Sequence, residues 1–119
     1  MFTEAFPILT VRDLPAALGF YTGLLGFQES YRFPDQGEPQ FVTVKLGHSE
    51  LGLGAGPAEP AASFSLCVYT ADCDAAVEKL RAAGTPVLEE PSGRPWGERM
   101  ARVTDPAGHE IVIVARADG

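Results

Sequence analysis

The chain has the sequence ILTVRDLPAAL at residues 8–18 and CVYTADCDAAV at residues 67–77, and the two segments share one pattern. In both stretches an apolar run ends at an aspartate, and an alanine-rich segment with helical spacing follows. Each half then closes on a histidine, a glutamate and an apolar run, HSELGL at residues 48–53 and HEIVI at residues 109–113. Such self-similarity indicates two copies of one supersecondary unit. We therefore predict that any ligand pocket lies where the two halves meet.

The length of the chain suits one domain, because each half of the 119 residues alone is too short to bury a stable core. A glycine- and proline-rich stretch near the middle is the best linker candidate. We predict a single domain over residues 1–119. It consists of a first module at about 1–56, a linker at about 54–62 and a second module at about 63–119.

Charge and cysteine content limit the partners and the compartment. A net charge of −7 repels phosphate backbones, so nucleic acid is not an expected partner, whereas a cationic small molecule is attracted. No apolar run is long enough to span a bilayer, and the first residues lack the basic start of a secretory signal, so no membrane partner is expected. Cys67 and Cys73 do not form a disulfide framework. Reduced thiols and a cytoplasmic location are the simplest interpretation.

Apolar periodicity and turn residues predict the order β-α-β-β-β in each half. In the first half, Asp13 is expected to cap a helix that ends at Gly26; in the second, Asp72 caps a helix that ends at Gly84. The predicted strands are residues 5–12, 27–33, 41–46, 49–54, 63–70, 86–89, 99–104 and 109–115.

Alternation along these strands separates two sheet faces. One face is uniformly apolar and is predicted to lie under the helices: Leu9, Val11, Val42, Val44, Leu46, Leu51, Leu53, Leu66, Val68, Ile111 and Ile113. The opposite face mixes small, polar and aromatic residues: Phe6, Ile8, Thr10, Phe41, Thr43, Lys45, Glu50, Gly52, Gly54, Ser65, Cys67, Tyr69, Met100, Arg102, Glu110 and Val112. A face of this composition is either solvated or lines a pocket.

Two groups of motifs resemble the vicinal-oxygen-chelate superfamily. The segment TVRDL at residues 10–14, followed by FYTGLLGF at 20–27, is similar to its first module. The segment WGER at 96–99, followed by VTDPAGH at 103–109, is similar to its closing hairpin. The superfamily includes glyoxalase I, extradiol dioxygenases, fosfomycin-modifying enzymes and bleomycin-resistance binding proteins. The resemblance implies an α+β fold of two βαβββ modules around a sheet-lined cleft, completed in a homodimer.

The resemblance also implies where a metal would bind. Metal enzymes of the group hold a divalent ion with His and Glu side chains from four strands, and those places here are Phe6, Gly52, Ser65 and Val112. The internal repeat supports this alignment, because Phe6 matches Ser65 and Gly52 matches Val112. None of these residues is a histidine or a carboxylate, the donors that such metals need. We therefore expect no cofactor and assign no catalytic or metal-ligating residue.

Several residues have both a functional and an ordinary structural interpretation. Trp96 is either a stacking platform for a planar ligand or a loop anchor or dimer contact. Glu50 and Glu110 either attract a cationic ligand or pair with Lys45 and Arg102 across neighbouring strands. His48 and His109 are expected to be exposed turn histidines, and Cys73 to be slightly acidified by its helix N-terminus. The candidate ligand-binding residues are Phe6, Phe33, Phe41, Gly52, Ser65, Cys67, Tyr69, Trp96, Met100, Arg102, Glu110 and Val112.

The sequence therefore favours a binding protein over an enzyme. The start AFPILTV at residues 5–11 is similar to the bleomycin-resistance branch, whose members sequester a large cationic antibiotic without transforming it. Our preferred hypothesis is a cytoplasmic homodimer that binds a small organic ligand, with cationic aromatic molecules and antibiotic sequestration as its sharpest form. The alternatives are a metal-dependent lyase or dioxygenase with a relocated metal site, and a degenerate partner-binding module.

Overall fold

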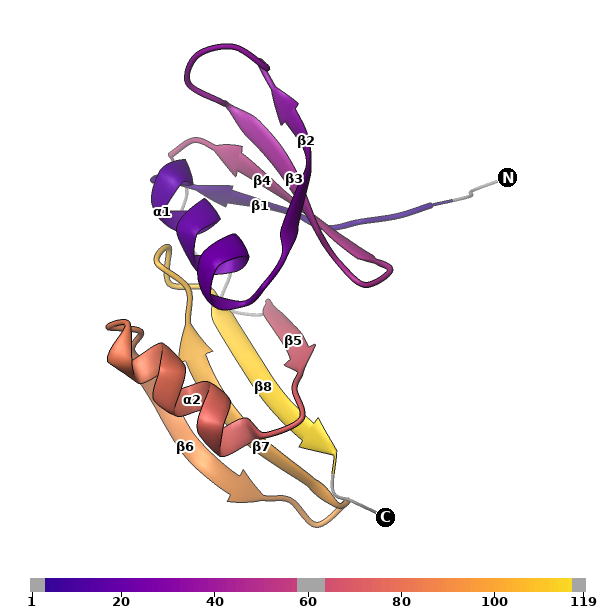
Figure 1. Cartoon of the computed structure of the whole chain (residues 1–119), viewed down its shortest axis with the longest axis vertical. Coiled ribbons are helices and arrows are strands. Elements are labelled where there is room, and N and C mark those ends of the chain that lie inside the picture. Colours follow the sequence, from indigo (N-terminus) through magenta and orange to yellow (C-terminus); the bar gives the residue numbers. More distant parts are fainter. Residues whose placement is uncertain (1–3, 58–63, 117–119) are drawn as a thin grey trace. The chain divides into compact units, whose positions relative to one another are not determined.

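The computed structural model describes residues 4–57 and 64–116, and the chain divides into two compact units, residues 1–59 and 60–119. Figure 1 shows that each unit is a β-sheet with its helical segment packed against one face. We call the other face of each sheet its outer face.

Within residues 4–57, the strands form a four-stranded sheet in the order β1-β4-β3-β2. β1 runs parallel to β4, and the other neighbours are antiparallel. In chain order the elements are β1 (Ile8–Val11), α1 (Leu14–Leu18), the π-helix η1 (Gly19–Leu24), β2 (Gln28–Phe33), β3 (Phe41–Leu46) and β4 (Ser49–Ala55).

Within residues 64–116, the second unit repeats this topology in the order β5-β8-β7-β6, again with one parallel pair, β5 and β8. Its elements are β5 (Ser65–Tyr69), α2 (Cys73–Ala82), β6 (Val87–Gly93), β7 (Glu98–Thr104) and β8 (Glu110–Arg116). The registers agree as well, since Ile8 lies opposite Gly52 and its repeat counterpart Cys67 lies opposite Val112. The predicted α+β fold of two βαβββ modules is confirmed.

The two predicted aspartate caps start the two helices. Asp13 Oδ1 accepts a hydrogen bond from the Ala16 amide at 3.0 Å, and Asp72 Oδ1 accepts one from the Ala75 amide at 3.1 Å. Each bond satisfies one of the amides that a helix leaves unpaired at its first turn.

The first helical segment differs from the single helix that the sequence predicted up to Gly26. It changes after Leu18 into η1, and the Leu25 amide donates to the Phe20 carbonyl at 3.1 Å. Glycines at 19 and 23 have little preference for α geometry, so the wider turn costs little there. The buried Tyr21 ring packs edge-to-face on Phe20 and Phe27, which holds the segment against the sheet.

The core of each unit lies between its helical segment and its sheet. Most of the apolar face predicted for the core is buried, and so are the predicted inward residues of α2, Cys73, Val77 and Leu80. Three members of the predicted core differ. Leu46 is exposed because it ends β3 next to a hairpin turn, and Leu66 and Val68 are only half-buried because β5 is an edge strand.

Two strands differ in length from the prediction. β1 begins at Ile8 rather than residue 5, because Pro7 has no amide hydrogen to donate, so Phe6 lies ahead of the strand. β6 runs to Gly93 rather than stopping at Glu89, and it carries irregularities in its pairing with β7. It includes Pro91, which an edge strand tolerates. No helix in the described residues has the length and apolar character needed to cross a membrane.

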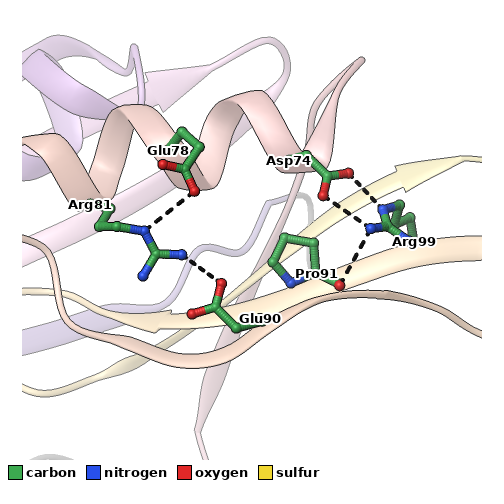
Figure 2. A network of polar contacts seen from close by, with 6 residues as sticks. All are labelled: Asp74, Glu78, Arg81, Glu90, Pro91 and Arg99. Atoms are coloured by element: carbon green, nitrogen blue, oxygen red, sulfur yellow. Dashed lines mark hydrogen bonds and ion pairs between the residues drawn. The ribbon is translucent and has the colours of Figure 1, made fainter.

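Exposed ion pairs connect α2 to the sheet of its unit, as Figure 2 shows. The Arg99 guanidinium on β7 donates to both oxygens of Asp74, at 2.6 and 3.0 Å, and to the Pro91 carbonyl at 3.4 Å. Arg81 on α2 pairs with Glu78 on its own helix and with Glu90 on β6. The hydrogen bonds from Arg99 hold the pKa of Asp74 below its usual value.

Candidate functional site

The outer face of the first unit is built around Gly52 on β4. Gly52 has Ile8 on one side and Thr43 on the other, and Phe41 on β3 pairs with the next outward residue, Gly54. A methyl group on Gly52 would lie 3.0 Å from Ile8 Cγ1 and 3.1 Å from Phe41 Cζ. The absence of a side chain at 52 therefore lets the Phe41 ring and Ile8 close over the strand.

Aromatic and aliphatic side chains extend this surface toward β2. The Tyr31 and Phe41 ring centroids lie 6.4 Å apart, and Phe33 pairs directly with Phe41. Ile8, Tyr31 and Phe33 are each more than half exposed, and Phe6 is exposed ahead of β1. Tyr31 was missed by the sequence analysis, although its two-residue spacing from Phe33 places it on the same face.

Polar groups occupy the adjoining part of this outer face. The Ser30 hydroxyl lies 2.7 Å from Thr43 Oγ1 and donates to Glu50 Oε2 at 3.1 Å. Ser30 reaches both because the β2 register shifts between Glu29 and Tyr31. Glu50, for which a pair with Lys45 was considered, is thus held by a serine hydroxyl.

An open hollow of about 650 Å³ runs along β2, and residues 29–35 line it. Phe33 and Tyr31 contribute its aromatic surface. Arg32 donates to both oxygens of Glu29 at 2.7 Å and holds the pKa of that carboxyl below its usual value.

The outer face of the second unit brings together seven of the twelve predicted site residues. Cross-strand pairing aligns them in rows across β5, β8 and β7. The seven are Ser65, Cys67, Tyr69, Met100, Arg102, Glu110 and Val112.

The charged residues of this face are paired with one another. Arg102 Nη2 forms an ion pair with Glu110, and Arg102 Nη1 lies 4.0 Å from Glu89 Oε1. This is the cross-strand pair that the sequence offered as the ordinary interpretation of Glu110. The charge of Glu110 is therefore largely balanced by Arg102.

An aromatic cluster lies at the far end of the same face. Trp96 Nε1 donates to Glu98 Oε1 at 2.8 Å, and the Tyr69 hydroxyl donates to Glu98 Oε2 at 3.5 Å. The Arg116 guanidinium carbon lies 4.1 Å from the Tyr69 ring centroid. Sequence reasoning selected Tyr69 and Trp96 but missed Glu98 and Arg116, which only the strand register brings to them.

Neither thiol is activated as a nucleophile. Cys67 is exposed as a residue, but partial burial of its thiol, with a contribution from the negative charge of Glu98, raises its pKa. Burial also raises the pKa of Cys73, and Asp74 adds to that effect, so the expectation of an acidified Cys73 was wrong. The desolvation of the thiolate outweighs the field of the helix N-terminus there.

His109 is buried, with 4% of its surface exposed, so the expectation of an exposed turn histidine was wrong for it, whereas His48 is exposed. Asp105 Oδ1 accepts from the Ala107 and His109 amides at 2.9 and 2.8 Å, and Asp105 Oδ2 lies 3.2 Å from His109 Nδ1. The aspartate therefore folds the turn over the imidazole, which also packs edge-to-face on Phe64.

Comparison with known proteins establishes the family. The sequence profile of the Glyoxalase/Bleomycin resistance protein/Dioxygenase superfamily matches residues 5–113, so the chain belongs to that superfamily. The chain is 34% identical over 94 residues to "Putative glyoxylase CFP32" of Mycobacterium bovis. The match covers 77% of this chain but only 36% of that relative, so the chain spans about a third of its length.

Two solved structures share the fold. The first is a member of the same superfamily from Sphaerobacter thermophilus, with 25% identity, a TM-score of 0.75 and coverage of 96% of this chain and 98% of that one. The second is a lactoylglutathione lyase from Agrobacterium tumefaciens, with 22% identity, a TM-score of 0.71 and coverage of 95% and 93%.

The four residues that the sequence resemblance aligns with the superfamily's metal ligands do not fit a divalent ion. Phe6 and Val112 are apolar, Ser65 offers only a hydroxyl, and Gly52 has no side chain. The space above Gly52 is taken by Phe41 and Ile8. In residues 4–57 and 64–116, no group of three or more His, Cys, Asp or Glu side chains is arranged to hold a metal.

Proposed function

We propose that this chain binds a small organic molecule without transforming it, and that the outer sheet faces contact the ligand. The observation that carries the proposal is the packing of Phe41 over Gly52. A position where the family's metal enzymes have a ligand is here glycine, and an aromatic ring covers it. An apolar wall thus stands where a metal centre would otherwise form.

The proposed contacts are those selected from the sequence, extended by Ile8 and Tyr31. Exposed aromatic and aliphatic side chains supply apolar area, which contributes about 25 cal/mol per Å² removed from water. The proposed ligand-contacting residues are Phe6, Ile8, Tyr31, Phe33, Phe41, Gly52, Ser65, Cys67, Tyr69, Trp96, Met100, Arg102, Glu110 and Val112.

The favoured ligand is a cationic aromatic molecule, and the favoured form of the function is antibiotic sequestration. The net charge of −7 attracts cations over a distance set by the ionic strength. The start of the chain is similar to the bleomycin-resistance branch, and the proposal places the chain in that branch as a homodimer. Two free thiols suit a reducing compartment, so the proposed location is the cytoplasm. The cleft predicted where the modules meet stays a prediction.

A thermal-shift screen in EDTA tests the proposal. The panel contains bleomycin-type and other polycyclic cationic drugs, together with neutral analogues of similar size, and titration calorimetry follows each hit. We expect saturable, metal-independent binding that Phe41→Ala weakens. Leu88→Ala is the matched control, because Leu88 is an exposed apolar residue outside the proposed contacts. The absence of any shift or heat across the panel would contradict the proposal.

A second candidate is a metal-dependent lyase with a relocated metal site, which the name of the mycobacterial relative favours. Metal analysis of protein purified without chelator separates the two candidates. Stoichiometric Zn, Ni, Mn or Fe would favour the lyase. The third hypothesis, a partner-binding module, predicts that only a protein partner changes the Trp96 fluorescence.

A further inference from the structure

One carboxylate accepts hydrogen bonds from two exposed aromatic side chains, a short one from Trp96 and a long one from Tyr69. Glu98 Oε1 accepts a hydrogen bond from the Trp96 indole, and Glu98 Oε2 accepts one from the Tyr69 hydroxyl. Trp96 is 64% exposed and Tyr69 50% exposed, so much of the area of both side chains is accessible although their polar edges are bound. Glu98 therefore orients the Trp96 indole and contacts the Tyr69 hydroxyl, while the apolar area of both rings stays largely available.

The short loop that carries Trp96 is itself closed. The Arg94 amide donates to the Glu98 carbonyl at 2.7 Å, and the Gly97 amide donates to the Arg94 carbonyl at 3.0 Å. Gly97 has a φ of 93°, a conformation that glycine adopts without strain. The loop thus presents the indole on a tight turn next to the sheet.

The Tyr69 ring already has a cation on it. The planar guanidinium of Arg116 lies 4.1 Å from the ring centroid, within the range of cation–π attraction. Arg116 is also the cross-strand partner of Glu98. The chain's own arginine therefore shows that the Tyr69 face attracts a planar cation, with the acidic Glu98 on the neighbouring strand.

A hollow of about 440 Å³ adjoins the cluster, and Glu98 and Arg116 both line it. The other arginines in its lining are engaged by carboxylates, Arg94 by Glu89 and Arg99 by Asp74. Arg116 differs because it rests on an aromatic ring, a weaker and more replaceable contact. The negative charge of Glu98 also contributes, after burial, to the raised pKa of Cys67 on the same face.

We propose that Tyr69, Trp96 and Glu98 form a subsite for the planar cationic group of a small ligand, and that Arg116 is an internal occupant which this group displaces. The subsite would take an amidinium, a guanidinium or a charged nitrogen heterocycle. The inference rests on the proposed small-molecule function and adds to it the charge and shape of one ligand group.

Fluorescence titration with benzamidine tests the subsite, because Trp96 is the chain's one tryptophan. Benzamide, which has a similar shape without the charge, is the control ligand. We expect saturable quenching by benzamidine and binding of benzamide weaker by about tenfold or more. Equal affinity for the two ligands, or no saturable quenching by benzamidine, would overturn the proposal.

Three variants sharpen the test. Arg116→Ala removes the internal occupant and is expected to tighten benzamidine binding about threefold or more, whereas Glu98→Gln is expected to weaken it about tenfold. Arg81→Ala is the matched control for net charge, because Arg81 pairs with Glu78 and Glu90 away from the cluster. Circular dichroism checks that Glu98→Gln is folded. Unchanged or weaker binding by Arg116→Ala would contradict the displacement.

The outcome separates this inference from the broader proposal. If a drug from the panel binds wild type and Glu98→Gln with the same affinity, the subsite is contradicted and the proposed binding function is still supported. Saturable benzamidine binding without any hit in the drug panel would support the subsite and contradict the proposed drug-binding function.

Discussion

The outer face has no room for a methyl group at position 52, so Gly52→Ala directly tests the packing of Ile8 and Phe41 over this residue. The added carbon would lie 3.0 Å from Ile8 Cγ1, 3.1 Å from Phe41 Cζ and 3.2 Å from Phe41 Cε1. Gly54 is the matched control on the same face, because its added carbon would meet Phe41 Cδ1 at an ordinary 3.7 Å. Neither glycine has a positive φ, so backbone strain does not distinguish them.

The size of the effect follows from two opposing contributions. Replacing glycine by alanine restricts the unfolded chain and stabilises a compatible site by about 0.4–1 kcal/mol. Inserting a carbon into a filled site costs about 1–3 kcal/mol. Ile8 is exposed and can rotate, which favours the lower part of that range. We expect Gly54→Ala to be about 0.5 kcal/mol more stable than wild type and Gly52→Ala about 1 kcal/mol less stable.

Urea denaturation followed by circular dichroism measures both free energies of unfolding. The ring proton shifts of Phe41 report the displacement independently, because the ring has to move in Gly52→Ala and can stay in Gly54→Ala. Two variants of equal stability with unchanged Phe41 shifts would refute the conclusion that Phe41 and Ile8 fill the space above Gly52.

Three further predictions concern the second unit. The pH dependence of Cys67 alkylation by iodoacetamide should give a pKa above the ordinary thiol value. Glu98→Gln should lower this pKa without restoring the ordinary value, since burial is the main cause of the shift. The same pH dependence of alkylation in wild type and Glu98→Gln would contradict the role of Glu98. The pKa of Asp74 is depressed in the folded state, so Asp74→Asn should be less stable than wild type at pH 6. Well below pH 3.8, where the side chain at position 74 is neutral in both proteins, the two free energies of unfolding should be equal. A difference in stability that persists at low pH would contradict this cause. Asp72→Ala should destabilise the protein by about 1 kcal/mol in chemical denaturation, because it removes the cap of α2; no loss would mean that the cap is dispensable.

The duplicated topology was predictable because it depends on local signals that occur twice. Aspartates at 13 and 72 have a side chain suited to capping, and apolar alternation assigns one face of each sheet to the core. The predictions that failed concern residues whose burial depends on tertiary contacts. His109 is buried by a turn that Asp105 organises through two backbone amides, and no local pattern announces that burial.

The candidate surface was predictable only in part. Alternation placed Phe41, Cys67 and Val112 on the outer faces, and the registers agree with this. Contacts between strands distant in sequence were harder to predict, so the hydrogen bond from Trp96 to Glu98 and the position of Arg116 over the Tyr69 ring were missed. The closeness of Phe41 to Gly52 likewise depends on the register of β3 and β4.

The most direct test of metal-free ligand binding on the outer faces is an amide NMR titration of EDTA-treated protein with the tightest ligand from the drug panel. We predict saturable shifts at outer-face amides such as Thr43, Gly52, Cys67 and Val112, with the helical residues largely unaffected. Shifts confined to α1 or α2, or saturation that requires an added divalent metal, would contradict the proposal.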